Sequence, residues 1–61
     1  MLVIQRRANE GIVITLGKIR VRVIVAKYAD GKVKLGIDAP PEVTVHRDEV
    51  QAEIDRENRN G

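Results

Sequence analysis

The sequence predicts a mainly β domain of five short antiparallel strands followed by one C-terminal helix. Sixteen of the 61 residues are valine or isoleucine, the β-branched types that suit a pleated sheet. Turn residues and a Pro-Pro pair separate the apolar stretches, and apolar residues take helical spacing only near the C-terminus. The whole chain, residues 1–61, is therefore expected to form a single domain.

The first two strands are expected over residues 2–7 and 12–16. Leu-Val-Ile-Gln-Arg-Arg forms the first, and Asn9-Glu10-Gly11 interrupts it, because asparagine and glycine adopt positive φ more readily than other residues. Ile-Val-Ile-Thr-Leu forms the second. Gly17-Lys18 then provides a two-residue hairpin turn with glycine first, as a type II′ turn requires.

The third strand, residues 19–26, shows the clearest alternation. Aliphatic side chains occupy its odd positions, and Arg20 and Arg22 lie between them. The Asp30-Gly31 pair is a strong hairpin signal and leads into a fourth alternating strand over residues 32–38. Both strands are therefore expected to turn one face inward and a charged face to solvent.

The C-terminal third is expected to change from strand to helix. Pro40-Pro41 ends the fourth strand, because proline cannot donate to a β-ladder, and a short fifth strand follows over residues 43–46. A helix is expected over residues 48–57, with two acids in its first turn and arginines near its end, the charge order that complements the helix dipole. Residues 58–61 are expected to fray.

The chain has few means of stabilising itself alone. It has no cysteine for a disulfide, and a domain of this size buries only about 60% of the surface that its unfolded chain exposes. A small five-stranded sheet also leaves two edges and one apolar face uncovered. A homodimer that pairs edge strands between chains would cover them, and it is the expected assembly.

Catalysis and membrane insertion are both disfavoured. The chain has no serine or cysteine, a single imidazole at His46 and no glycine-rich phosphate loop, so we expect no catalytic residue, metal, cofactor or small-molecule substrate. No apolar run approaches the roughly 18 residues of a membrane span. Arg6-Arg7 interrupts the N-terminal segment too early for a signal peptide, which predicts a cytoplasmic protein without a membrane partner.

The charge is distributed unevenly along the chain. Residues 1–36 carry eight basic residues against two acids, a balance of +6, whereas residues 37–61 have a balance of −4. This asymmetry indicates a half that faces a polyanion, although lysine and arginine also simply solvate the outer faces of strands. Tyr28 is the only Phe, Tyr or Trp residue, which disfavours a base-stacking platform. Recognition of nucleic acid would have to use arginine, backbone groups and aliphatic packing, and arginine favours guanine.

Two basic pairs are candidates for binding. Alternation sends the side chains of Arg6 and Arg7 to opposite faces, although charge on an edge strand also protects it from aggregation. His46 precedes the helix with Glu49 three positions later, which favours an N-cap-like role. A binding role is favoured for Arg47, because a cation at a helix start opposes the dipole.

Three segments together closely resemble the carbon storage regulator (CsrA/RsmA) family: MLVIQRRANE at residues 1–10, LGIDAP at residues 35–40 and EVTVHRDEV at residues 42–50. The match runs from Met1 to about Ile54. The resemblance implies an intertwined homodimer in which the first strand of one chain pairs with the fifth strand of the other. It also implies two sites that bind single-stranded GGA motifs in hairpin loops of mRNA leaders, overlapping the ribosome-binding site.

The resemblance implies further that binding blocks ribosome access and represses translation or alters mRNA stability, and that small RNAs with the same motif titrate the protein. The family's RNA surface, carried over onto matching positions, comprises Ile4, Gln5, Arg6 and Arg7 of one subunit with Ala39, Pro40, Val43, Val45, His46 and Arg47 of the other. Arg47 would be the main guanidinium contact and Ile4 an aliphatic wall. Asn9 replaces a glycine usual in the family, and Asp38 replaces a common asparagine, where a carboxylate would oppose phosphate if it faces the site.

Two other functions fit the basic strands. One is a dimeric transcription factor that lays a β-ribbon into the major groove of DNA. The other is an interaction module whose basic face binds an acidic protein.

Overall fold

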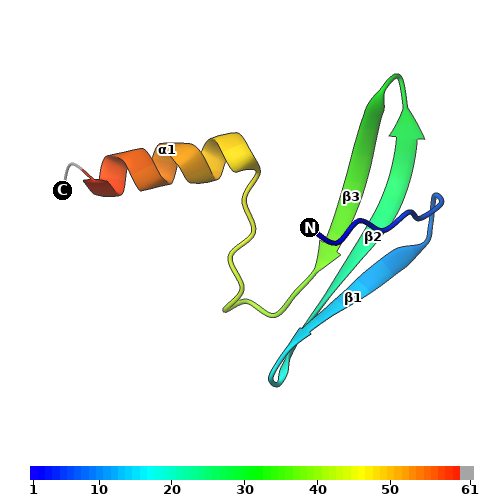
Figure 1. Ribbon diagram of the computed structural model, residues 1–61, viewed down its shortest axis with the longest axis horizontal. Coiled ribbons are helices and arrows are strands. Elements are labelled where there is room, and N and C mark those ends of the chain that lie inside the picture. Colours follow the sequence, from blue (N-terminus) through cyan, green and yellow to red (C-terminus); the bar gives the residue numbers. More distant parts are fainter. Residues whose placement is uncertain (60–61) are drawn as a thin grey trace.

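The computed structural model describes residues 1–59 and contains three strands and one helix (Figure 1). Strands β1 (Gly11–Leu16), β2 (Ile19–Ala29) and β3 (Lys32–Asp38) form an antiparallel sheet in the order β1-β2-β3. Helix α1 (Asp48–Arg59) follows. The expected mainly β architecture with one C-terminal helix is confirmed.

Both predicted hairpins are confirmed. Leu16 pairs with Ile19 across Gly17-Lys18, where Gly17 alone has a positive φ of 60°, the φ pattern of a type II′ turn. Asp30 and Gly31 both have positive φ, at 56° and 71°, as a type I′ turn requires. These turns fix the register in which the three strands pair.

Strand β2 extends three residues beyond the predicted end at residue 26. The pairing of β2 with β3 shifts between Val25 and Lys27, so a β-bulge leaves Ala26 without a partner. Beyond the bulge the ladder continues to Ala29, which pairs with Lys32. The predicted strand ended too early because a bulge breaks the simple alternation from which strands are recognised in a sequence.

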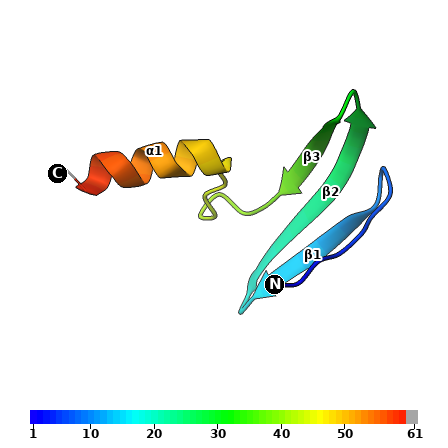
Figure 2. The ribbon, with the colours of Figure 1, turned by 45° about the horizontal axis from the view of Figure 1, so that its top comes forward.

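The two outer strands of the five predicted are not strands within this single chain. Residues 2–7 cross one face of the sheet, and residues 43–46 lie in the connection from β3 to α1 (Figures 1 and 2). An extended segment becomes a strand only when a neighbouring strand completes its hydrogen bonds. Among the described residues neither segment has such a neighbour, so three of the five predicted strands form within the single chain, and the two that were expected to pair between chains do not.

The sheet separates apolar from charged side chains, as the alternation predicted. Ile12 and Leu35 lie on the same face, because their strand partners Val23 and Val25 are two residues apart on β2. We define the apolar face by the side chains on this side: Ile12, Ile14, Leu16, Ile19, Val21, Val23, Val25, Tyr28, Val33, Leu35 and Ile37. We define the outer face by the charged side chains opposite: Arg20, Arg22, Lys27, Lys32, Lys34 and Asp38.

The apolar face is only partly covered in the single chain. No side chain among the described residues is buried, and Leu16 and Leu35 are 74% and 57% exposed. Helix α1 projects away from the sheet and packs on none of the strands (Figures 1 and 2). A sheet with an apolar face needs a second layer against it, and this chain does not supply that layer within its described residues.

Helix α1 is longer than predicted at its C-terminal end. Asn58 and Arg59 are helical, and neither residue is a glycine or proline that would end the ladder. The expectation that this tail frays stays a prediction. The rest of that expected tail, residues 60–61, lies outside the described residues. Nowhere in residues 1–59 is a helix long and apolar enough to cross a membrane.

Candidate nucleic-acid interface

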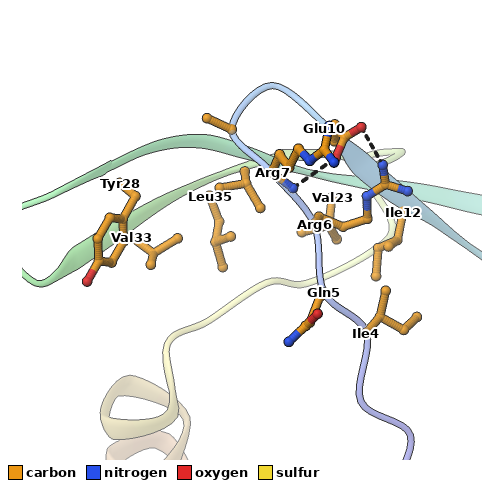
Figure 3. Close-up of a pocket in the computed structure, with 12 residues that line it drawn as sticks. Ile4, Gln5, Arg6, Arg7, Glu10, Ile12, Val23, Tyr28, Val33 and Leu35 are labelled. Atoms are coloured by element: carbon orange, nitrogen blue, oxygen red, sulfur yellow. Dashed lines mark hydrogen bonds and ion pairs between the residues drawn. The ribbon is translucent and has the colours of Figure 1, made fainter.

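The N-terminal residues of the predicted site lie over the apolar face. Ile4, Gln5, Arg6 and Arg7 line an open hollow of about 1020 Å³ whose other walls include apolar-face side chains such as Leu35 (Figure 3). Four of the predicted site residues, which are consecutive in the chain, therefore lie beside apolar side chains of the sheet that stay partly exposed.

Glu10 fixes this segment to the end of the sheet. Its Oε2 lies 2.7 Å from the Arg6 guanidinium, and its Oε1 accepts a 2.9 Å hydrogen bond from the Arg7 N–H (Figure 3). The Glu10 N–H donates to the Arg7 carbonyl at 3.0 Å, and the Val25 N–H donates to the Glu10 carbonyl at 2.9 Å. Arg6 is thereby engaged within the chain, whereas Arg7 forms no ion pair with another described residue.

Sequence reasoning did not identify this role of Glu10. The available signal was the spacing of Arg6 and Glu10 by four residues, but that spacing is informative mainly in helices. Here a tight turn, not a helix, brings the two side chains together.

Asn9 makes the turn between Arg7 and Glu10 possible. Its φ is 69°, and its N–H donates a 2.7 Å hydrogen bond to the Val25 carbonyl. Asparagine is among the non-glycine residues most often found at positive φ, because its short side chain tolerates the left-handed region. The replacement of the family's usual glycine by Asn9 is therefore compatible with the turn.

The contacts of Glu10 predict a pH dependence of stability. The hydrogen bond from Arg6, and secondarily that from the Arg7 N–H, lower the pKa of Glu10 below its ordinary value of 4.5. A carboxylate with a lowered folded-state pKa stabilises the fold above its unfolded pKa, and this contribution is lost as pH falls through the folded value. Glu10→Gln should therefore reduce the free energy of unfolding at pH 7 and have a shrinking effect below pH 4.5.

Denaturant unfolding of both proteins at several pH values measures this difference. Glu53→Gln is the matched control, because Glu53 is an exposed acid of α1 that forms no hydrogen bond or ion pair with another described residue. A Glu10→Gln effect that is the same at pH 7 and at pH 3 would show that the carboxylate charge does not fix the segment.

The other six predicted site residues lie in or next to the connection between β3 and α1. Ala39, Pro40 and Val43 are partly buried, and the Val43 N–H closes a turn onto the Pro40 carbonyl at 3.0 Å. Val45, His46 and Arg47 are exposed. Ala39 and Pro40 also line a second hollow, of about 410 Å³, that opens on the outer face of the sheet.

Arg47, and not His46, is the N-cap of α1. The N–H groups of Val50 and Gln51 both donate to the Arg47 carbonyl at 3.0 Å, so the predicted N-cap-like role of His46 is wrong. The helix begins one residue later than that role requires, because the Arg47 carbonyl accepts its first hydrogen bond. Arginine is not among the residues whose side chains cap helices well.

The Arg47 side chain contributes little to the fold. Its Nε lies 3.2 Å from Glu49 Oε1, but the two side chains are 79% and 67% exposed. An ion pair this exposed is worth between zero and about 1 kcal/mol. The guanidinium therefore projects from the helix start into solvent, where a ligand that offers paired acceptors could displace Glu49.

The two groups of predicted site residues are not brought together within one chain. The N-terminal segment lies over the sheet, whereas the connection carries Val45, His46 and Arg47 away from it (Figures 1 and 2). The hollow beneath the N-terminal segment is lined by that segment and the sheet, and by no residue of the connection. Residues 1–59 also contain no group of three histidine or acidic side chains that could hold a metal ion.

Comparison with known proteins gives one consistent result. The CsrA family, described as a global regulator protein family, matches residues 1–56. The chain is 46% identical over 59 residues to the translational regulator CsrA of Halothermothrix orenii, covering 97% of this chain and 69% of the relative. It is 48% identical over 58 residues to that of Alkaliphilus oremlandii, covering 95% and 74% of the two chains.

A third relative, the translational regulator CsrA of Rhodopirellula baltica, is 45% identical over 58 residues, covering 95% of this chain and 79% of the relative. These names describe regulatory proteins and not enzymes. No significant match was found among solved structures.

Proposed function

Because the chain belongs to the CsrA family of global regulators, we propose that it is a post-transcriptional regulator that binds GGA motifs in hairpin loops of mRNA leaders. Binding at the ribosome-binding site blocks ribosome access and represses translation, or it alters mRNA stability. Small RNAs that carry the same motif compete for the protein in the cytoplasm. The family match and the relatives named translational regulators support this proposal.

One structural observation carries the proposal furthest: the candidate site is divided within the chain. Ile4 to Arg7 lie over an apolar face on which no side chain is fully buried, and Arg47 lies on a connection that leads away. A second copy of the chain would cover the apolar face and would also bring its own Arg47 next to residues 4–7 of the first chain. In the proposed homodimer, residues 2–7 of one chain pair with residues 43–46 of the other, and the two apolar faces form the core.

Each of the two resulting sites recognises RNA without aromatic stacking. The Arg47 guanidinium presents a planar fork that matches O6 and N7 of guanine. Ile4 and Val45, both about half exposed, provide aliphatic surface against the bases. Main-chain groups of the same two segments supply further hydrogen bonds, so sequence selectivity rests on one arginine and the backbone.

Filter binding with three ligands tests the proposal. The ligands are an RNA hairpin with GGA in its loop, the same hairpin with CCA, and a DNA duplex of equal length, all at one salt concentration because phosphate contacts make affinity salt-dependent. We expect tight binding of the GGA hairpin and weak binding of the other two. Equal affinity for the GGA and CCA hairpins would contradict the proposal. Tighter binding of the DNA duplex would favour a β-ribbon transcription factor instead.

A further inference from the structure

The outer face of the sheet carries a strong excess of positive charge outside the proposed recognition site. Arg20, Arg22, Lys27, Lys32 and Lys34 are all exposed there, against the single acid Asp38. None of these basic side chains forms an ion pair with another described residue. At about 3.3 Å per residue, these side chains are spread over roughly 30 Å along the β2–β3 hairpin.

The arrangement of these charges disfavours folding. Lys27 and Lys34 are direct partners across β2 and β3, and like charges at opposed positions destabilise a sheet. Solvation of the sheet would be served as well by alternating lysine and glutamate. A row of cations without internal partners is instead the pattern expected when an external polyanion supplies the opposite charge.

The outer face is also continuous with residues of the proposed recognition site. Arg20 and Arg22 line the hollow of about 410 Å³ together with Ala39 and Pro40, which belong to that site. Asp38 lines the same hollow and is the strand partner of Arg22. An RNA strand that leaves Ala39 and Pro40 therefore meets the two arginines next. This continuity favours nucleic acid over an acidic protein as the partner.

Resting on the proposed function, we propose that the outer face is a second, sequence-independent RNA contact that binds the phosphate backbone of nucleotides flanking the recognised motif. The flanking strand enters at the hollow beside Arg20 and Arg22 and continues over Lys27 and Lys34. The Asp38 carboxylate, which lines the same hollow, repels the phosphates of the flanking strand and lowers the affinity for long RNAs. Message length outside the GGA loop thereby contributes to affinity.

Two RNAs separate this contact from base recognition. One is the minimal GGA hairpin, and the other is the same hairpin with a single-stranded extension long enough to cross the roughly 30 Å face. We measure the association constant of each as a function of salt. Three backbone contacts should make the slope of log K against log salt steeper by about 2 for the extended RNA, at about 0.7 for each contact with a single strand.

The triple variant Arg22→Gln/Lys27→Gln/Lys34→Gln should abolish this difference in slope and leave binding of the minimal hairpin unchanged. Lys34→Gln alone should reduce the slope for the extended RNA by about 0.7. Arg56→Gln is its matched control, because it removes the same charge from an exposed position on α1. Asp38→Asn should instead make the slope for the extended RNA steeper.

Each outcome decides the proposal. Failure of the wild-type protein to bind the minimal hairpin would remove the proposed function and this inference with it. Binding of the minimal hairpin with the same slope for both RNAs would overturn this inference alone and return the outer face to solvation or an acidic protein. An equal reduction of the salt slope for the extended RNA in Lys34→Gln and Arg56→Gln would also overturn it. The slope would then depend on the net charge of the protein and not on the outer face.

Discussion

Arg47→Ala is expected to weaken binding of the GGA hairpin by roughly 1–3 kcal/mol per site, the usual range for a bidentate contact between arginine and guanine. The fold should be unaffected, because the Arg47 side chain is 79% exposed and its ion pair with Glu49 is weak. Filter binding measures the affinity, and circular dichroism with thermal unfolding measures the fold. Unfolding of the variant would show that Arg47 is structural and would contradict the site.

Two further substitutions at Arg47 distinguish its roles. Arg47→Asn places a favourable N-cap residue at the helix start, so it should stabilise the protein by up to about 1 kcal/mol while losing RNA affinity. Arg47→Lys keeps the charge and loses the planar fork, so it should recover little of the affinity. If Arg47→Lys binds the GGA hairpin with wild-type affinity, the contact is with phosphate and not with guanine.

Leu35→Ala is expected to reduce the free energy of unfolding by about 2–5 kcal/mol, the range measured for truncating buried leucine. In the single chain Leu35 is 57% exposed, and truncating an exposed side chain usually changes stability by no more than about 0.5 kcal/mol. The large effect follows only if a second copy covers the apolar face. Denaturant unfolding at fixed protein concentration measures it.

Val13→Ala is the control for Leu35→Ala. Val13 is 56% exposed on the opposite side of the sheet, where no second layer is expected, so its truncation should have a small effect. The melting temperature of the wild-type protein should also rise with protein concentration, because folding and association would be coupled in the proposed homodimer. Equal, small effects of the two substitutions would mean that the apolar face remains in solvent.

Most of the sheet could be predicted from local signals. Asp30-Gly31 and Gly17-Lys18 fixed both hairpins, because their conformational preferences act within two residues. The alternation around Arg20 and Arg22 correctly separated the two faces. The bulge at Ala26 could not be predicted, because it depends on how β3 aligns with β2 and not on the sequence of β2 alone.

The parts that differ from the predictions depend on more than local composition. Residues 2–7 and 43–46 have strand composition, but composition cannot show where a hydrogen-bonding neighbour comes from. The ion pair of Glu10 with Arg6 could not be predicted from spacing, because the turn at Asn9 and not a helix brings the two side chains together. The N-cap is Arg47 and not the predicted His46, because helix ends are recognised in sequence only to within one or two residues.

In the proposed homodimer, each recognition site contains residues of two chains. This is tested most directly by mixing Ile4→Ala/Arg7→Ala with Arg47→Ala after each variant alone has been shown to bind the GGA hairpin poorly. In a symmetric dimer with shared sites, each heterodimer has one site without substitutions and one with all of them.

Refolding the two variants together should therefore restore wild-type affinity at about one quarter of the sites at equal mixing. Titration of the refolded mixture with labelled GGA hairpin measures this fraction. If both groups of residues acted within the same chain, every site in the mixture would keep a substitution. Absence of any high-affinity sites, with heterodimers present, would contradict the account.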